Sequence, residues 1–176
     1  MTQGAIGCTL SHLSILQDAY DSGYENIWIL EDDIKVIKNP LILDDYISEL
    51  NRELGEGNWD ILYTDLPPRH KCFSNKLHIK RVFFRPDMEN TINNFYEITK
   101  ILNKNFVQIK SRLRTHSMVI SRSGIEKILA FYKKNKIYIP YDLELALIPE
   151  INIYNLSFNL VSVSCGVSDT SSKRSK

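Results

Sequence analysis

The chain has 176 residues, of which 43% are hydrophobic and 24% charged, and its formal net charge is +1. A domain of this length buries a substantial core, and a net charge near zero gives no electrostatic reason to expect a nucleic acid as partner. Cys8, Cys72 and Cys165 are far apart and odd in number. This pattern argues against a zinc ribbon or a disulfide framework and favours reduced thiols in a cytosolic protein.

The hydropathy pattern indicates no targeting or membrane segment. The first residues contain no basic region followed by an apolar run. No apolar stretch approaches the roughly 18 residues of a spanning helix. We therefore expect a cytoplasmic protein without a transmembrane segment, with peripheral contact at the inner face of the membrane left open. Residues 1–167 are expected to form one domain, and the polar, basic residues 168–176 a loose tail.

The first expected element is a helix over residues 4–22. Apolar residues recur at spacings of three and four and predict its buried face: Ile6, Leu10, Leu13, Leu16 and Tyr20. Gly23 is placed to end this helix in a left-handed conformation. Ser11 and His12 fall on the less apolar side, where an exposed or hydrogen-bonded role is the simpler interpretation of His12.

Residues 26–34 carry the main functional signal. Four apolar residues are followed by Glu31, Asp32 and Asp33. The apolar run predicts a strand buried on both faces, and ligands of open α/β sheets bind beyond the carboxyl ends of such strands. Adjacent carboxylates repel one another unless a cation lies among them, and oxygen ligands suit Mg²⁺ or Mn²⁺. A divalent-metal site for a phosphate ester and a solvated acidic turn both remain open.

The middle of the chain offers a second acidic pair and a second strand. Asp44 and Asp45 open a predicted helix over residues 43–54, where the helix dipole favours negative charge, so we assign them to helix stability. Residues 59–65 predict a strand that ends at Asp65, a weak site candidate.

Residues 69–114 are basic and aromatic without a sustained period, which suggests loops or an inserted helix over the site. No RNA-binding motif accompanies them.

The last third predicts a strand over residues 115–121 that leads into a helix. Ser123 and Glu126 have the spacing of a capping box at the start of this helix, and residues 151–163 are β-rich. We predict an α/β fold in which residues 27–31, 60–64 and 117–121 form adjacent core strands. The acids at 31–33 and Asp65 should then lie near the same edge of the sheet.

Three patterns in this order resemble glycosyltransferase family 25. They are Gly4-Ala5-Ile6-Gly7-Cys8-Thr9-Leu10-Ser11-His12, then Leu30-Glu31-Asp32-Asp33, then His116-Ser117-Met118-Val119-Ile120-Ser121-Arg122 with Gly124 and Pro140-Tyr141-Asp142. The family includes lipooligosaccharide galactosyl- and glucosyltransferases and collagen galactosyltransferases. The resemblance covers most of the chain and is weakest from Pro67 to Arg114.

The resemblance implies a GT-A type fold, with a mixed, mostly parallel sheet and helices on both faces. It also implies transfer of a hexose, galactose or glucose, from a UDP-sugar to a hydroxyl of a glycan or glycolipid acceptor such as lipooligosaccharide, with inversion. No nucleic acid partner is expected.

The resemblance also implies roles for individual residues. Glu31 and Asp33 would hold Mn²⁺ or Mg²⁺, and Asp142 would be the catalytic base or a further metal contact. The expected substrate-binding residues are Asp32, Ser11, His12 and His116. Ser168-Asp169-Thr170 resembles a tail element that closes over the diphosphate.

One departure from the family pattern bears on donor binding. The family normally has a strand and a helix before the Gly4–His12 segment that help to build the base-and-ribose pocket, so we expect that part to be incomplete here. A truncated, non-catalytic relative that binds sugar or protein is therefore an alternative. A phosphatase with an aspartyl nucleophile fits less well, because its usual Asp-x-Asp pattern is absent at Glu31-Asp32-Asp33.

Overall fold

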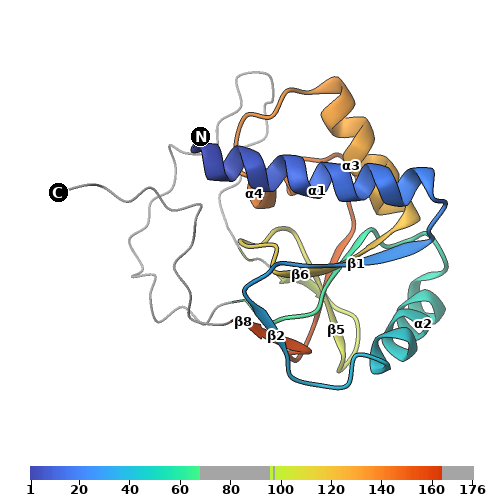
Figure 1. The fold of residues 1–176 in the computed structure, drawn as a ribbon. Coiled ribbons are helices and arrows are strands. Elements are labelled where there is room, and N and C mark those ends of the chain that lie inside the picture. Colours follow the sequence, from blue (N-terminus) through green and yellow to red (C-terminus); the bar gives the residue numbers. More distant parts are fainter. Residues whose placement is uncertain (68–95, 97, 164–176) are drawn as a thin grey trace.

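A computed structural model describes residues 1–67, 96 and 98–163, and its elements are arranged as in Figure 1. The helices are α1 (Gln3–Asp21), α2 (Ile42–Leu54), α3 (Arg122–Lys134) and α4 (Tyr141–Leu145). The strands are β1 (Asn26–Leu30), β2 (Ile34–Val36), β3 (Ile61–Tyr63), β4 (Ile98–Ile101), β5 (Phe106–Ile109), β6 (Ser117–Ser121), β7 (Ile153–Leu156) and β8 (Val161–Val163). None of the helices in these ranges combines the length and the apolar character needed to cross a membrane.

The main sheet has six strands in the order β1-β6-β3-β7-β5-β4. β6 lies between β1 and β3, as predicted for the three core strands, and it runs antiparallel to both. Only β3 and β7 are parallel neighbours, while β5 is antiparallel to β7 and to β4. The α/β class and the mixed sheet are thus confirmed, but the expectation of a mostly parallel sheet is wrong for these strands.

The direction of β6 has a physical cause in the path of the chain. After β3, the chain passes through the β4–β5 hairpin at the far side of the sheet and returns to enter β6. It enters beside the carboxyl ends of β1 and β3, with Ser117 opposite Leu30 and Met118 opposite Tyr63. Three strand ends therefore meet at one edge. We expected loops or a helix over residues 69–114, but the described part of this range contains the β4–β5 hairpin. Residues 68–95 and 97 lie outside the described ranges.

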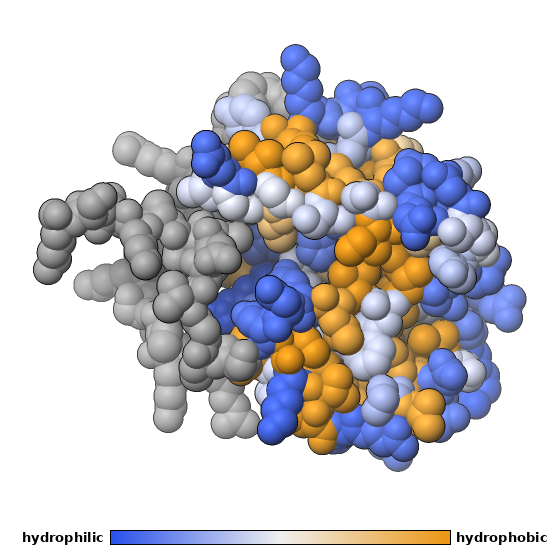
Figure 2. Space-filling view, in the orientation of Figure 1, coloured by the Kyte–Doolittle hydropathy of each residue, from blue (hydrophilic) through white to orange (hydrophobic). Residues whose placement is uncertain are grey.

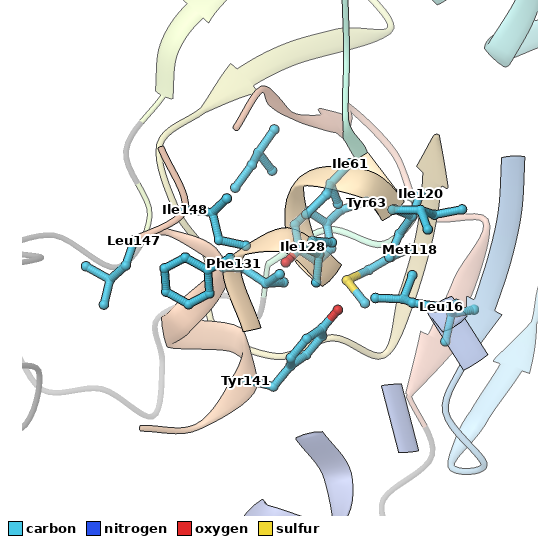
Figure 3. Close-up of a cluster of buried hydrophobic side chains, with 14 of the residues drawn as sticks. Leu16, Ile61, Tyr63, Met118, Ile120, Ile128, Phe131, Tyr141, Leu147 and Ile148 are labelled. Atoms are coloured by element: carbon cyan, nitrogen blue, oxygen red, sulfur yellow. The ribbon is translucent and has the colours of Figure 1, made fainter. Parts of the chain in front are cut away.

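Helices cover both faces of the main sheet, as predicted. Neighbouring residues of a strand point to opposite faces, so Met118 and Ile120 pack with α1, α3 and α4, whereas Val119 packs with α2. Figure 3 shows Leu16 of α1 and Tyr141 of α4 beside Met118 in the first cluster. The second cluster joins Leu43 and Leu50 of α2 to Trp59, Leu62, Phe106, Val119 and Tyr154.

Helix α1 buries a face that overlaps the expected one only at Leu16, which is fully buried, and at Leu13, which is partly buried. Its buried residues are Ala5, Thr9, His12, Leu16 and Ala19, whereas Ile6, Leu10 and Tyr20 are exposed, Leu10 by 53%. Figure 2 shows hydrophobic residues exposed along α1. Small residues on the buried face let the helix lie close to its neighbours, which larger side chains would prevent. This rotation places His12 inside the protein and leaves Ser11 exposed.

The start of α3 also differs from the expected capping box. The N-cap is Ser121, whose side chain accepts a hydrogen bond from the backbone of Gly124. The Ser123 hydroxyl instead donates to the buried Asp60, which also holds the Lys127 ammonium at 2.7 Å. Ser123 thus ties α3 to β3.

At the end of α1, Gly23 is left-handed, with φ of 73°, as predicted.

Candidate active site

The edge where β1, β3 and β6 meet carries the acidic cluster. The backbone N–H of Glu31 donates to the carbonyl of His116 at 2.9 Å, and the Thr115 hydroxyl donates to the Glu31 carboxylate at 2.7 Å. These contacts extend the β1–β6 pairing beyond the strands and fix Glu31 in place. The following residues enter β2, which pairs with β8. In Figure 2, hydrophilic residues gather over the β1–β2 connection, below the N-terminal half of α1.

Glu31, Asp33 and His116 converge at this edge. One donor atom from each lies within 4.8 Å of the other two. Two carboxylates suit Mg²⁺ or Mn²⁺, and an imidazole adds a nitrogen ligand that transition ions accept more readily, so of these two ions the set fits Mn²⁺ better. Asp32 is exposed and is not part of this group of three. Asp44 and Asp45 lie on the first turn of α2, exposed to solvent, as the helix-stability assignment requires.

His12 approaches the cluster from α1. Its Nε2 lies 3.8 Å from Oε1 of Glu31, and its ring stacks on Tyr141 with centroids 4.4 Å apart. Burial alone would raise the pKa of Glu31, but contacts with His12 and Thr115 and the charge of His116 bring that pKa below its ordinary value. Glu31 is therefore a carboxylate at neutral pH, as a metal ligand must be.

Asp142 reaches the same edge from α4. The backbone N–H of Arg114 donates to its Oδ2 at 2.9 Å, and Arg114 has a left-handed backbone, with φ of 72°. Burial raises the pKa of Asp142, repulsion from Glu31 raises it further, and backbone hydrogen bonds from Arg114 and Leu143 only partly compensate. Asp142 directly follows Tyr141, which stacks on His12, and its partner Arg114 directly precedes Thr115, which bonds to Glu31. Asp142 therefore lies at the same edge as Glu31 despite their separation in sequence.

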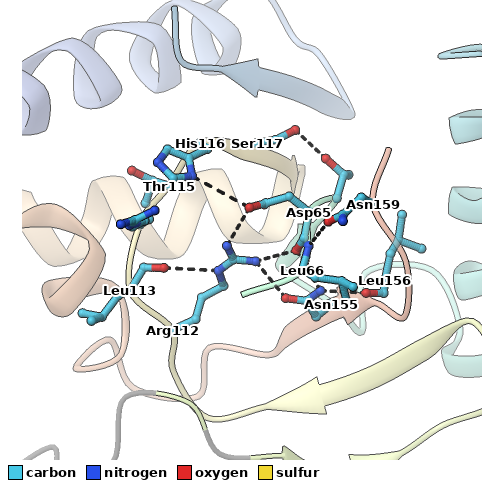
Figure 4. A network of polar contacts seen from close by, with 12 residues as sticks. Asp65, Leu66, Arg112, Leu113, Thr115, His116, Ser117, Asn155, Leu156 and Asn159 are labelled. Carbon is cyan, nitrogen blue, oxygen red and sulfur yellow. Dashed lines mark hydrogen bonds and ion pairs between the residues drawn. The ribbon is translucent and has the colours of Figure 1, made fainter. Parts of the chain in front are cut away.

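A buried ion pair between Arg112 and Asp65 lies beside the site (Figure 4). Arg112, only 2% exposed, donates to the Asp65 carboxylate at 2.8 Å, to the Asp65 carbonyl at 2.7 Å and to the Asn155 side chain at 2.9 Å. Oδ2 of Asp65 also lies 3.8 Å from Nδ1 of His116. Asp65 is thus near the site, as expected, but its carboxylate binds Arg112 and is not part of the donor group of Glu31, Asp33 and His116.

The sequence missed several of these residues for clear reasons. Arg112 lies in the segment that showed no period, and nothing local marks it as buried. Thr115 lies in the loop before β6 and Tyr141 begins α4, and they contact Glu31 and His12 only through tertiary structure. Cys8 was noted only as a thiol. Ser11, by contrast, is exposed on α1 and is not brought to the acidic cluster by the described structure. Ser168-Asp169-Thr170 lies outside the described residues.

Comparison with protein-family models matches residues 1–145 to the model described as glycosyltransferase family 25 (LPS biosynthesis protein). The match spans α1, the acidic cluster, His116 and Asp142. A search of curated proteins finds no match.

Proposed function

Because this chain belongs to glycosyltransferase family 25 and is therefore a glycosyltransferase, we propose a more specific activity for it. The protein transfers a hexose, galactose or glucose, from a UDP-sugar to a hydroxyl of a glycan or glycolipid acceptor such as lipooligosaccharide. The transfer inverts the configuration at the anomeric carbon and depends on a divalent ion. The observation that carries this proposal is the convergence of Glu31, Asp33 and His116 at one edge of the sheet, where Arg114, two residues before His116, also holds Asp142.

Glu31 and Asp33 are the proposed metal ligands, and the position of His116 makes it a third. The chemistry of this donor set fits Mn²⁺, with Mg²⁺ as the weaker choice. When bound, such an ion supplies positive charge to offset the charge that develops on the diphosphate leaving group. Thr115 holds the Glu31 carboxylate through its hydroxyl, and the Asp65 carboxylate lies 3.8 Å from Nδ1 of His116. Asp32, which is exposed beside these ligands, stays a candidate contact for the sugar nucleotide.

Asp142 is the proposed catalytic base. As the acceptor oxygen bonds to the anomeric carbon, the bond from that carbon to the diphosphate oxygen breaks, and the acceptor proton passes to the Asp142 carboxylate. A raised pKa suits this role, because a base accepts a proton best when its pKa approaches the working pH. The Arg114 backbone N–H donates to Oδ2 of Asp142 and holds this carboxylate oxygen in place.

A cytoplasmic location is also proposed, with the acceptor met at the inner face of the membrane. The odd number and wide spacing of Cys8, Cys72 and Cys165 in the sequence favour a reducing compartment. His12 is retained as a residue that borders the donor, since it lies against Glu31.

The proposal is tested by measuring ion binding and turnover separately. Calorimetry would follow Mn²⁺ binding to the wild-type chain and to Asp33→Asn, and a panel of UDP-sugars with Mn²⁺ would be screened for release of UDP. We expect Asp33→Asn to weaken Mn²⁺ binding and to abolish UDP release, while its circular dichroism spectrum stays that of the wild type.

The matched control is the double variant Asp44→Asn and Asp45→Asn, which also removes two adjacent acids. It should bind Mn²⁺ as the wild type does, because both residues lie on the exposed first turn of α2. Equal loss of Mn²⁺ binding in both variants would contradict the assigned site. Mn²⁺ binding without release of UDP from any hexose donor would contradict the assigned substrate.

A further inference from the structure

A second group of metal-binding side chains lies beside the acidic cluster. Cys8 and His12 are four residues apart on α1, so they share one face of the helix on successive turns. One donor atom each from Cys8, His12 and Glu31 lies within 4.8 Å of the other two. The thiol and the carboxylate are half-buried, and the imidazole is buried.

His12 gives an independent reason to expect a ligand here. Its side chain is only 5% exposed, and no group in the described ranges forms a hydrogen bond with its Nδ1. Buried polar nitrogens are nearly always hydrogen-bonded, so an unpaired one calls for an explanation. Stacking on Tyr141 fixes the plane of the ring, and its other nitrogen already lies 3.8 Å from the Glu31 carboxylate. The imidazole is therefore held beside the Glu31 carboxylate, and its Nδ1 has no hydrogen-bond partner among the described residues.

We propose that Cys8, His12 and Glu31 form a site for a thiophilic transition ion, represented by Zn²⁺. Thiolate, imidazole and carboxylate are the three ligand types that Zn²⁺ takes in proteins, whereas Mg²⁺ and Mn²⁺ prefer oxygen. Three protein ligands leave the fourth tetrahedral position to water. As the Cys8 sulfur bonds to the ion, the thiol proton passes to solvent. The site needs no residue outside the described structure.

Sharing of Glu31 links this site to the proposed catalytic ion. Glu31 belongs to both donor groups, so an ion bound to Cys8 and His12 draws on a carboxylate that the site with Asp33 and His116 also uses. We expect Zn²⁺ to weaken Mn²⁺ binding. This linkage rests on the proposed function, whereas binding of Zn²⁺ at Cys8 does not.

The test uses Co²⁺ as a spectroscopic substitute for Zn²⁺, in the full chain with Cys72→Ser and Cys165→Ser so that Cys8 is its one thiol. We expect a thiolate-to-cobalt charge-transfer band that saturates at one ion per chain and disappears when Zn²⁺ is added. Cys8→Ser and Cys8→Ala should both lose the band, and His12→Gln should weaken Co²⁺ binding, with unchanged circular dichroism.

Asp33→Asn is the matched control, because it removes a ligand of the neighbouring group alone. It should keep the cobalt band while losing Mn²⁺ affinity. Absence of the band in the folded chain, or its persistence in Cys8→Ser, would overturn the Cys8 site whatever the outcome of the transferase assays. A cobalt band with Mn²⁺ affinity unaffected by Zn²⁺ would overturn the linkage through Glu31.

Discussion

The guanidinium of Arg112 and the carboxylate of Asp65 form a buried ion pair, with Nη2 of the arginine 2.8 Å from Oδ2 of the aspartate. The guanidinium also lies over the Tyr63 ring, 4.3 Å from its centroid. Asp65 follows β3, and Arg112 lies between β5 and β6. The pair therefore ties the loop that leads into β6 to the end of β3, beside His116.

We expect Arg112→Met to destabilise the fold strongly. Removing one partner of a buried pair leaves the other charge uncompensated, which typically costs about 3–5 kcal/mol. Urea unfolding followed by circular dichroism measures the change. Glu126→Gln is the control, because it breaks the surface pair of Arg122 and Glu126, which should contribute less than about 1 kcal/mol. Similar losses in the two variants would contradict a structural role for the Arg112 pair.

Transfer activity should fall as the pH drops through the raised pKa of Asp142. The base acts only when ionised, and burial together with the charge of Glu31 keeps its pKa above the ordinary aspartate value. The acid limb of the rate profile should therefore lie at a higher pH than an ordinary aspartate would give. Initial rates across the pH range measure it.

Asp142→Asn should reduce the rate by about 10²–10⁴-fold, the usual contribution of a general base. It should retain Mn²⁺ binding, since Asp142 is not part of the group formed by Glu31, Asp33 and His116. A wild-type rate that stays constant as the pH falls through the raised pKa of Asp142 would show that another group takes the proton. Lost Mn²⁺ binding would instead make Asp142 a metal ligand.

The acidic pair on α2 should affect stability only slightly. Replacing Asp44 and Asp45 by Asn removes negative charge from the first turn of the helix. Charge–dipole effects of this kind amount to about 1 kcal/mol or less, so the unfolding free energy should fall by no more than that. Thermal and urea denaturation check this. A larger loss would mean that the pair makes contacts beyond the helix dipole.

Gly124 should be intolerant of any side chain. A Cβ at this position would lie 2.3 Å from the backbone carbonyl oxygen of Asp60, so α3 would have to move away from β3. Overpacking of this kind typically costs about 1–3 kcal/mol. We expect Gly124→Ala to lower the free energy of unfolding, measured with urea, by an amount within or above this range. Gly7→Ala is the control, since a Cβ there meets no atom within 4 Å. Equal stability of the two variants would contradict the close contact.

The sequence alone determined the class of the fold and the location of its principal acids. Apolar runs rich in β-branched residues have few alternatives to buried strands, so β1, β3 and β6 were predicted as neighbours. Glu31 and Asp33 were predicted at a strand end because three adjacent carboxylates cannot be core. Asp44 and Asp45 could be separated from them by their place in the first turn of α2.

Tertiary structure alone decided which side chains join those acids. Two overlapping stripes of α1 have helical spacing and share Leu16. Packing in the folded protein selects the one with Ala5, Thr9 and His12, so periodicity predicted only part of the buried face. The direction of β6 depends on the path of the chain through the β4–β5 hairpin, which local patterns do not contain. Arg112 and Asp142 reach the edge from distant parts of the sequence. Their burial depends on partners that no local pattern specifies, because contacts between distant residues exist only once the chain is folded.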